Sequence, residues 1–514
     1  MTSRPRLFPF RGGLPLLRYK KALIYPPLDM PLSEHYVVPL QEYGKPEARV
    51  IVRVNQRVRR GESLTASEHE TTIPAHAPTS GFIEAIGLHP APHPSGEPGQ
   101  AVVIKSDGRD EAALPLSRPW THWRSATTVQ LLALIHQAGI TGLGGAAFPT
   151  ANKLLSACGN IDSLIVNGME SDPSLQCDQL LMQIQARKLI SGVAIAIHIL
   201  KPRNCIIAIN QNNHASLSAM RTALKTMKAL DNGVEIVALS PRYPGGSERQ
   251  LIHTLTGIEV PAMMTPISVG LLCHNVATLA AISTAVIEGE PFYRRWLTVA
   301  GEGLVQPRNL WARIGTPIRD TIRFCGGFSS RSHRLIMGGS MMGFELPNID
   351  APINKSCNSV LALPEAHTRP PRPCIKCGAC TAACPVGLLP QQLYSFSRTR
   401  NLDKAHTSHI QDCIECGCCE VVCPSTIPLV QYFQSAKGAL QVRQQSQTNA
   451  QLAKQRHEAR QTRMQREQTE QASARAARRQ TLRAAGKPQQ QPSPDKLIEA
   501  GRPGEKRRHP SKEP

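Results

Sequence analysis

The sequence contains two short runs of crowded cysteines, "CIKCGACTAACP" at residues 374–385 and "CIECGCCEVVCP" at residues 413–424. Within each run, four cysteines follow the spacing C-x2-C-x2-C-x3-C, and a proline comes directly after the fourth. The second run has one extra thiol, Cys418, where the first has Ala379. Because eight of the 15 cysteines repeat one metal-binding register, we expect a metal framework in a reducing compartment and no set of disulfides.

This spacing is the one with which bacterial two-cluster ferredoxins hold a pair of [4Fe–4S] clusters. Three thiolates two residues apart let a tight loop curl over three irons, whereas the fourth usually ligates the other cluster. The pattern predicts two crossed ligand sets, which are Cys374, Cys377, Cys380 and Cys423 for one cluster and Cys413, Cys416, Cys419 and Cys384 for the other. Gly378 and Gly417 are expected to let the backbone pass close to the inorganic sulfides, and Cys418 is expected to be a small packing residue.

A pair of zinc sites is the alternative interpretation of the two runs. Zinc normally takes its four ligands from two separated C-x-x-C pairs. Here each run holds four thiols by itself, which favours iron–sulfur clusters. Two neighbouring clusters imply that electrons pass through the protein one at a time.

Length and charge suggest several domains and an anionic partner. The 514 residues are too many for one ordinary core, and 59 Lys+Arg against 38 Asp+Glu give a net charge of +21. Residues 441–514 carry 17 Lys+Arg and 7 Asp+Glu, so about half of the excess lies in this tail. Because the tail has few apolar residues other than Ala, we expect a solvated helix or disorder. The tail is either a polybasic contact to an anionic membrane surface or a solubilising segment without a partner. Nucleic acid is a less suitable partner, because no aromatic residues lie among the basic residues of the tail.

The sequence predicts neither a signal peptide nor a membrane span. Pro and Gly interrupt every apolar run near the N-terminus, which leads us to expect a cytoplasmic protein. The longest uncharged stretch, residues 260–287, contains Pro261, Pro266 and His274. It is better explained as a buried helix or loop than as a segment that crosses a membrane.

Hydrophobic patterns divide the rest of the chain into β-rich and α/β sections. Short β-like segments with Gly and Pro turns occupy residues 36–105 and resemble the barrel-sandwich hybrid of biotinyl and lipoyl carriers. The connection 66–81 has no Lys, so we expect a scaffold and exclude a carrier. From about residue 127, apolar strands alternate with amphipathic helices, which predicts a doubly wound α/β domain that binds ligands at the carboxyl ends of its strands. A second β-rich section follows at about 291–363.

Residues 142–153, "GLGGAAFPTANK", form a glycine loop that opens into a predicted helix. Such a loop is a weak signal by itself because tight turns use glycine as often. Two later stretches give it weight, "IVNGMESDP" and "RYPGGSERQLI". They place polar residues near strand ends: Asn167, Glu170, Asp172, Tyr243, Gly246 and Glu248.

At this point the chain resembles a known family. The stretches "GLGGAAFPTANK", "NGMESDP", "YPGGSERQL" and "CHNVATLAAI" look like the flavin and NADH site of the FMN-carrying subunit of respiratory complex I. With the "FRGG" start and "DCIECGCCEVVCPSTIPLVQY", their order is similar to that of the RnfC/RsxC family of the Rnf/Rsx ion-translocating oxidoreductases. The match runs from about Phe10 to Phe433, roughly four-fifths of the chain.

The resemblance implies a multidomain α/β fold. Its expected parts are an N-terminal extension (1–35), a barrel-sandwich hybrid (36–110), a Rossmann-like FMN- and NADH-binding α/β domain (120–255), a small β-grasp-like SLBB domain (256–363), an α-helical two-cluster ferredoxin-like domain (364–436) and a disordered or helical basic tail (437–514).

The resemblance also implies roles for single residues. The FMN phosphate region would be held by Gly142, Gly144, Gly145 and Lys153, because N–H groups at a helix N-terminus favour an anion. Asn167, Asn275 and Thr278 would line the flavin pocket, and Phe148 would stack on the nicotinamide or adenine ring. The dinucleotide would be contacted by Glu170, Asp172 and Glu248 at its hydroxyls, with Tyr243 and Gly246 beside them. For each acidic residue the alternative is a helix cap or a solvated turn.

Several residues depart from the family pattern. Ala147 stands in place of Gly and His274 in place of Gln or Asn, and the stretch Ser171, Asp172, Pro173 and Ser174 stands in place of Cys, Glu, Pro and Tyr. They lead to an alternative in which the chain has lost its flavin site and is a non-catalytic iron–sulfur wire. The cysteine runs show no such change.

The function that the resemblance implies is that of a peripheral electron-transfer subunit. NADH would reduce FMN, and two [4Fe–4S] clusters would relay single electrons, because nicotinamide transfers two electrons together and a cluster accepts one. The complex would couple electron flow between NADH and ferredoxin, the latter reached indirectly, to ion movement at the cytoplasmic side of the inner membrane. Other subunits of the Rnf/Rsx complex would be partners. A soluble oxidoreductase without a complex, or a complex that reduces a redox-sensing regulator, are further alternatives.

Overall fold

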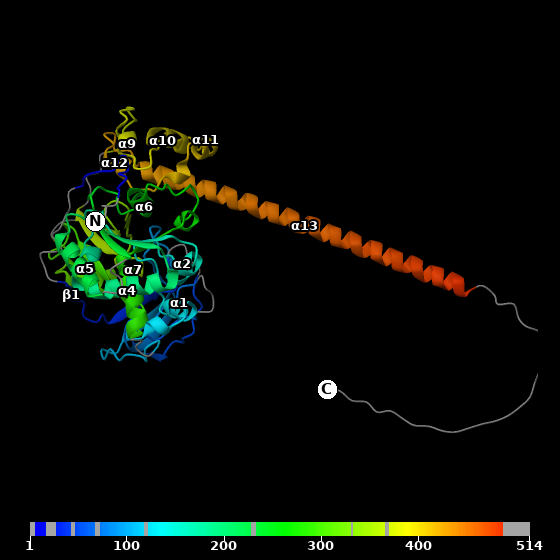
Figure 1. The fold of residues 1–514 in the computed structure, drawn as a ribbon, viewed down its shortest axis with the longest axis horizontal. Coiled ribbons are helices and arrows are strands. Elements are labelled where there is room, and N and C mark those ends of the chain that lie inside the picture. Colours follow the sequence, from blue (N-terminus) through cyan, green and yellow to red (C-terminus); the bar gives the residue numbers. More distant parts are fainter. Residues whose placement is uncertain are drawn as a thin grey trace, which may run out of the picture. The chain divides into compact units, whose positions relative to one another are not determined.

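The fold was analysed in a computed structural model that describes residues 6–16, 27–42, 47–66, 72–117, 122–227, 233–329, 333–364 and 370–486. The chain divides into two units, Met1–Leu440 and Gln441–Pro514, which are described separately (Figure 1). The first unit holds three sheets and the cysteine runs.

A four-stranded antiparallel sheet forms the first β-rich part, with the strand order β2-β5-β4-β3. Its strands are β2 (His35–Pro39), β3 (Arg57–Val58), β4 (Gly81–Pro90) and β5 (Pro98–Ser106). Side chains alternate across the sheet, so Tyr36 and Val38 of β2 point into a core that also contains Ile83, Val102 and Ile104. This sheet belongs to the β-rich section that the sequence predicts at residues 36–105. The connection 66–81, which has no Lys, lies partly outside the described residues.

A parallel sheet with the order β8-β7-β6-β9 forms the centre of the α/β part. Its strands are β6 (Ser163–Gly168), β7 (Asn204–Asn210), β8 (Val234–Leu239) and β9 (Leu271–Asn275). Its helices are α1 (Thr128–Gln137), α2 (Thr150–Ala157), α3 (Cys177–Ile184), α4 (Ala186–Leu200), α5 (His214–Thr226), α6 (Glu248–Thr256) and α7 (Val276–Ser283), with short turns of 3-10 helix at Trp123–Ser125 and Pro266–Val269 and of π-helix at Thr284–Glu288.

Helices cover both faces of this sheet, which explains why its strands read as apolar runs. Leu164 and Val166 of β6 face a core shared with α1, α4 and α7, whereas Ile165 faces α6. Strand β9 pairs in parallel with β6. The parallel sheet therefore extends beyond residue 255, where the sequence analysis places the end of this domain. The stretch 260–287 therefore supplies a buried strand and a buried helix.

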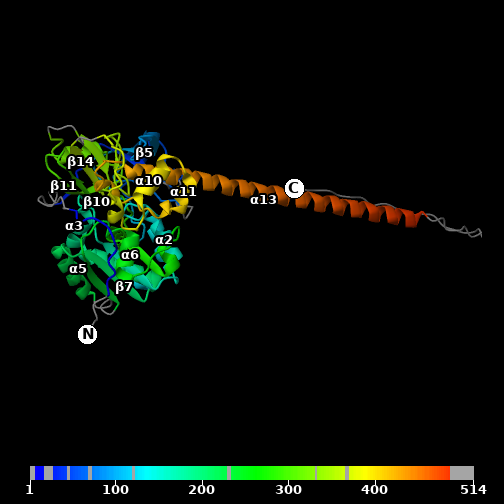
Figure 2. The ribbon, with the colours of Figure 1, turned by 90° about the horizontal axis from the view of Figure 1, so that it is seen from above.

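The third sheet has six strands in the order β1-β11-β10-β14-β12-β13. They are β1 (Leu28–Asp29), β10 (Arg294–Ala300), β11 (Arg308–Arg313), β12 (His333–Met337), β13 (Phe344–Glu345) and β14 (Ser359–Pro364), with helix α8 (Ile318–Phe324). Figure 2 shows β10, β11 and β14 together at one end of the unit, with α5, α6 and β7 at the other. Arg313 joins this sheet to the first one through two 2.8 Å hydrogen bonds to the carboxylate of Asp110.

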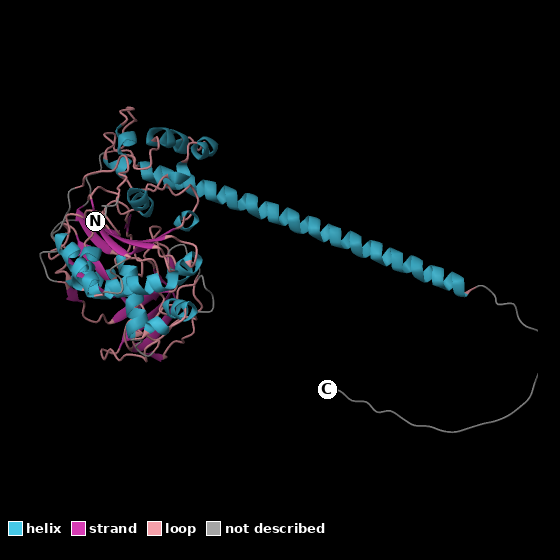
Figure 3. Cartoon of the chain, viewed as in Figure 1, coloured by secondary structure: helices cyan, strands magenta, loops and turns pink. Residues whose placement is uncertain are grey.

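The cysteine runs lie among short helices, and the described residues 370–440 contain no strand (Figure 3). The helices are α9 (Ala379–Ala383), α10 (Pro390–Arg398), α11 (Leu402–Thr407), α12 (Cys418–Val421) and the start of α13 (Leu429–Ala485), with a 3-10 turn at Ile410–Asp412. Their small core contains Leu393, Ala405, Ile410 and Phe433.

The second unit is helical up to Ala485, and every described side chain in it is exposed. This agrees with the prediction of a solvated helix; pairs at i, i+4 such as Arg466 and Glu470 (2.8 Å) add little stability each. The final residues, for which disorder is predicted, lie outside the described part of the chain. No single helix among the described residues is both long and apolar enough to cross a membrane; α3 and α4 reach the required length and composition only as a pair bent by 94°.

Candidate functional site

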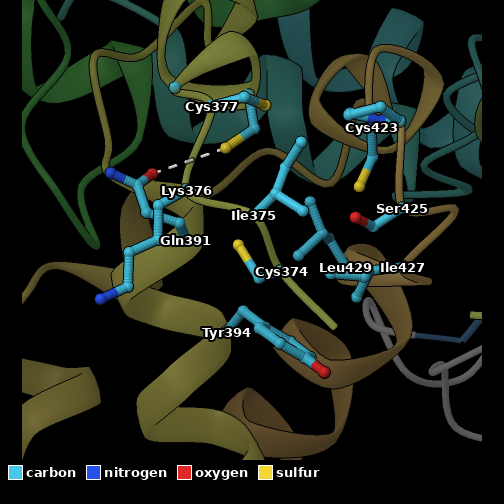
Figure 4. A pocket seen from close by; sticks show the side chains of 13 residues that line it. Cys374, Ile375, Lys376, Cys377, Gln391, Tyr394, Cys423, Ser425, Ile427 and Leu429 are labelled. Atoms are coloured by element: carbon cyan, nitrogen blue, oxygen red, sulfur yellow. Dashed lines mark hydrogen bonds between the residues drawn. The ribbon is translucent and has the colours of Figure 1, made fainter. Parts of the chain in front are cut away.

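Four of the eight repeated cysteines line one hollow, which we call the outer hollow: Cys374, Cys377, Cys380 and Cys423. It encloses ≈ 390 Å³ of empty space, open solvent included, and Tyr394 and Leu429 form part of its wall (Figure 4). Cys374 and Cys377 are exposed, and 68% of the neighbouring Ile375 is accessible. This hollow therefore opens at the molecular surface.

The other four line a second hollow, which we call the inner hollow: Cys384, Cys413, Cys416 and Cys419. Its empty space, ≈ 350 Å³, is similar in size to that of the outer hollow, but three of its four thiols are buried. Each hollow thus combines three thiols of one run with the fourth thiol of the other run. This grouping is the one expected of the crossed ligand sets, and four thiols around one space are a donor set that suits a [4Fe–4S] cluster.

The two runs have the same backbone conformation at matching positions. Lys376 and Glu415 have φ values of 57° and 56°, and Gly378 and Gly417 have φ values of 80° and 76°. A Cβ added at Gly378 would meet no atom within 4 Å, so left-handed φ, and not a lack of space, favours glycine there. Lys437 of α13 fastens the second run by donating to the carbonyl of Cys413 and to Glu415, both at 2.6 Å.

The fifth thiol of the second run, Cys418, lies outside both hollows. It is fully buried and packs with Tyr243, Ala383 and Cys416. Burial raises the pKa of the Cys413 thiol to about 11, so this ligand candidate must lose its proton when a metal binds.

The glycine loop that precedes α2 is closed by its own backbone. The N–H of Gly142 donates to the carbonyl of Phe148 (2.8 Å), and the N–H of Ala147 donates to the carbonyl of Gly142 (3.1 Å). Thr278 of α7 accepts from the N–H of Leu143 (3.0 Å). These bonds hold the loop against the start of α2 and α7.

Three consecutive N–H groups inside this loop, those of Gly144, Gly145 and Ala146, have no acceptor among the described residues. We call them the N–H cradle. A Cβ added at Gly144 would lie 3.4 Å from Asn275. A Cβ added at Gly145 would meet no atom within 4 Å, but the backbone there has a φ of 104°, which residues other than glycine rarely adopt. Unpaired N–H groups before a helix N-terminus bind anions well, so the cradle fits the phosphate of FMN.

Lys153 extends from α2, half-buried, and its ammonium donates to the carboxylate of Glu248 (2.9 Å) and to the carbonyl of Cys273 (2.7 Å). The predicted partners Lys153 and Glu248 are therefore neighbours, although 95 residues separate them. The pair leaves a cation on α2, the helix that follows the glycine loop, and one carboxylate neutralises it.

Three predicted polar residues of the flavin and dinucleotide site take part in protein hydrogen bonds. Asn275 caps α7 at the N–H of Ala277 (2.8 Å) and donates to Asp178 (2.6 Å). Glu170 accepts from the N–H groups of Asp178 (2.8 Å) and Gln179 (2.9 Å) and so caps α3. Asn167 donates to the carbonyl of Gly246 (2.8 Å), a contact from β6 to the loop before α6.

Asp172 and Tyr243 contact other parts of the first unit. The carboxylate of Asp172 accepts from the N–H groups of Ser174 (2.9 Å) and Met341 (3.1 Å), the latter in the loop between β12 and β13. The hydroxyl of Tyr243 donates to the carbonyl of Cys416 (2.8 Å). Phe148 is 44% exposed.

The departures from the family pattern have visible consequences. Ala147 is buried with a φ of 48°, a left-handed conformation that glycine adopts more easily. His274 is buried, and desolvation together with the ammonium of Lys153 lowers its pKa well below the ordinary value, so its ring is neutral. Among the described residues, Nε2 of His274 and the hydroxyls of Thr141 and Thr150 are buried without a partner. Thr141 and Thr150 stand close before and after the N–H cradle in the sequence.

Sequence patterns alone did not single out Asp178 or Arg295. Arg295 of β10 is buried and donates to the carbonyls of Leu143 (3.5 Å) and Lys355, and it thereby ties the glycine loop to the third sheet. Glu170, Cys177 and Asp178 bring their ligand atoms within 4.8 Å of one another. An Arg within an apolar strand could have indicated that Arg295 has a structural role. Its partners are 60 and 152 residues away in the sequence, so local patterns do not identify them.

Four family models match the chain. They are the RnfC barrel sandwich hybrid domain at residues 8–109, the Nuo51 FMN-binding domain at 135–284, the SLBB domain at 297–345 and the 4Fe-4S dicluster domain at 373–427. The chain therefore carries an FMN-binding domain and a domain for two [4Fe–4S] clusters, and the predicted fold class is confirmed.

Curated relatives carry the name of the C subunit of the ion-translocating oxidoreductase complex. The protein of Pseudomonas aeruginosa is 41% identical over 476 residues, which cover 91% of this chain and 60% of the relative. The protein of Yersinia pseudotuberculosis serotype O:3 is 41% identical over 464 residues, which cover 89% of this chain and 65% of the relative. The protein of Yersinia pestis bv. Antiqua is 40% identical over 464 residues, which cover 89% of this chain and 74% of the relative. The chain spans 60% to 65% of the length of the first two relatives.

Among solved structures, a chain of an NAD+-reducing [NiFe]-hydrogenase in the H2-reduced state is similar to this one. The alignment covers 63% of this chain and 65% of the hydrogenase chain, with 18% sequence identity and a TM-score of 0.46. The sequence relatives are much more similar, and they agree with the family that the sequence motifs indicate. The chain belongs to the RnfC family, the C subunits of ion-translocating oxidoreductase complexes.

Proposed function

We propose that this chain is a peripheral electron-transfer subunit that takes electrons from NADH at an FMN site and relays them through two [4Fe–4S] clusters to partner subunits. The observation that carries the proposal is that one compact unit contains the N–H cradle, followed by the helix of Lys153, and two hollows with four thiols each. A flavin can accept a hydride and release its electrons singly, whereas the clusters can only carry single electrons onward, so the proposed relay needs both groups.

At the flavin site the residues bind and orient. The N–H groups of Gly144, Gly145 and Ala146 would hold the phosphate, and Lys153 would exchange part of its contact with Glu248 for the anion. Asn167, Asn275 and Thr278 would line the pocket, and the exposed Phe148 would stack on the incoming dinucleotide. When bound, FMN supplies the conversion between hydride transfer and single-electron transfer.

At the cysteine runs the chain supplies eight thiolates in two crossed sets. Loss of the thiol protons, whose release burial opposes in the case of Cys413, would accompany cluster binding. The inner hollow is buried and the outer hollow opens to the surface, which gives the relay an inner and an outer end.

The relatives are named as members of ion-translocating oxidoreductase complexes, and we extend this to the chain. Its partners would be the other subunits of such a complex, which would couple electron transfer between NADH and ferredoxin to ion movement. We place the chain at the cytoplasmic side of the inner membrane. The basic tail would help there, because each Lys or Arg near an anionic leaflet gains about 1 kcal/mol. Release from washed membranes by high salt would support this placement.

A second candidate function is an iron–sulfur wire that has lost its flavin. The left-handed φ of Ala147 favours it, because a Cβ in that conformation stands where family members carry glycine. In that case electrons would come from another flavoprotein and NADH would have no direct effect.

Anaerobic purification followed by iron, sulfide and flavin analysis distinguishes these functions. The proposal predicts about eight irons and eight sulfides per chain, together with FMN and a visible spectrum that bleaches with NADH. The same iron content without flavin and without bleaching would support the wire. Zinc without sulfide would contradict both.

A further inference from the structure

Tyr243 lies between the α/β part and the inner hollow. Its side chain is 3% exposed, and its hydroxyl donates to the carbonyl of Cys416 at 2.8 Å. It packs in one apolar cluster with Ala383 and Cys418. This tyrosine therefore contacts the peptide of an inner-hollow cysteine and both of the cysteine runs.

The other end of the same short segment reaches the predicted flavin residues. The carbonyl of Gly246 accepts from Asn167 (2.8 Å), and Glu248 pairs with Lys153 (2.9 Å). The six residues from Tyr243 to Glu248 thus connect the peptide of Cys416 with the ammonium of Lys153. No comparable contact joins the outer hollow to these flavin residues in the described part of the chain.

A strand-like stretch near the N-terminus reinforces this junction. Leu14 and Tyr243 exchange two backbone hydrogen bonds (2.8 and 2.9 Å), and the N–H of Gly13 donates to the carbonyl of Ala383 (2.9 Å). A Cβ added at Gly12, whose φ is 63°, would lie 2.4 Å from the carbonyl oxygen of Cys384. Glycine at this position lets the N-terminal stretch approach a second inner-hollow cysteine directly.

We propose that Tyr243 is a positioning residue: its hydroxyl, together with the Gly12–Gly13 stretch, holds the inner-hollow cysteines on the α/β part so that the inner set faces the flavin site. This inference deepens the proposed function and rests on it. The hydroxyl also points the positive end of its dipole at the peptide of a ligand candidate. Hydrogen bonds and burial around the cysteines are among the factors that set the potential of an iron–sulfur cluster.

The removal of the hydroxyl alone, in Tyr243→Phe, tests the inference. The ring keeps its packing while the carbonyl of Cys416 loses its donor, so the reduced form of the inner cluster becomes less favourable. We expect an EPR-monitored potentiometric titration of the full chain to show a shift to a lower potential in one of two cluster signals. That signal should be the one lost in Cys419→Ser and retained in Cys377→Ser.

Tyr394→Phe is the matched control. Tyr394 lines the outer hollow and meets Tyr432 edge-to-face at 4.9 Å, so its variant should leave the inner signal unchanged. Gly12→Ala provides a second test through a different atom, because its Cβ would push the carbonyl of Cys384; it should alter the same inner signal.

The outcomes separate this inference from the function on which it rests. Two clusters with an unshifted inner potential in both Tyr243→Phe and Gly12→Ala would overturn the positioning role and leave the proposed function intact. A shift of the outer signal instead would overturn it as well. A wild-type chain without iron and sulfide would overturn the proposed function, and this inference with it.

Discussion

The ammonium of Lys153, a residue of the helix that follows the glycine loop, lies 2.9 Å from the carboxylate of Glu248 and 2.7 Å from the carbonyl of Cys273. The cation is therefore held in place before any anion arrives, and one carboxylate competes with that anion. Because a Lys ammonium binds phosphate as a point charge, an arriving phosphate would replace part of this ion pair.

Lys153→Met should weaken FMN binding by a factor of about 10 to 100, since a hydrogen bond to a charged group contributes roughly 1.5–3 kcal/mol. Glu248→Gln should keep or strengthen the binding of FMN, because it removes the competing charge and retains an acceptor for Lys153. Fluorescence titration of the flavin-free chain with FMN measures both. Equal affinity in wild type and Lys153→Met would contradict the assigned role of the lysine.

Ala147→Gly should improve the glycine loop. The left-handed φ of 48° costs an alanine about 1 kcal/mol relative to glycine. We expect more FMN to remain bound after gel filtration, without loss of thermal stability. Ala146→Gly is the control, because Ala146 has no left-handed φ and gains only chain flexibility there. Equal flavin retention in both variants would argue against strain at Ala147.

Cys418→Ala and Cys419→Ala differ by one position and should differ in cluster content. Cys418 is fully buried outside both hollows, whereas Cys419 lines the inner hollow. The first variant should keep about eight irons per chain, and the second should lose about half of them. A loss of iron in Cys418→Ala would show that the second run uses a different ligand register.

Stability should fall with acid because of a buried histidine, His76, in the connection that precedes strand β4. Burial, and after it the charge of Lys355, lower the pKa of His76 to about 3, while an unfolded histidine has a pKa of about 6.5. The unfolded chain therefore binds more protons between these values, and stability is lost as the pH falls below about 6.5. From pH 7.5 to 5 the loss is about 2 kcal/mol for this group. Hydrogen exchange of residues 36–110 measures it, and His76→Leu should flatten the slope.

Local spacing carried much of the cysteine prediction. The loops that hold three thiols are short, and the rule known from two-cluster ferredoxins assigns each fourth cysteine to the other run. The two hollows group the thiols in this way. The alternation of strands and helices likewise predicts the parallel sheet, because each element is formed mainly by residues close in the chain.

Contacts between domains could not be predicted from local patterns. Asp172 is expected at the dinucleotide, yet its carboxylate accepts from Met341, 169 residues away. Tyr243 reaches Cys416 across 173 residues, and Arg295 reaches Leu143 across 152. These pairs depend on how separate cores pack against one another, and no spacing rule within one element encodes that packing.

The central claim is that one chain joins an NADH-accepting flavin site to two crossed clusters. An EPR spectrum of the anaerobically purified full chain, recorded before and after addition of NADH, tests it most directly. The account predicts that NADH produces the signals of two reduced [4Fe–4S] clusters in the wild type, and that in Lys153→Met these signals are weaker with NADH and reach full intensity with dithionite. Clusters that dithionite reduces but NADH leaves oxidised, in a wild-type chain that contains FMN, would contradict the claim.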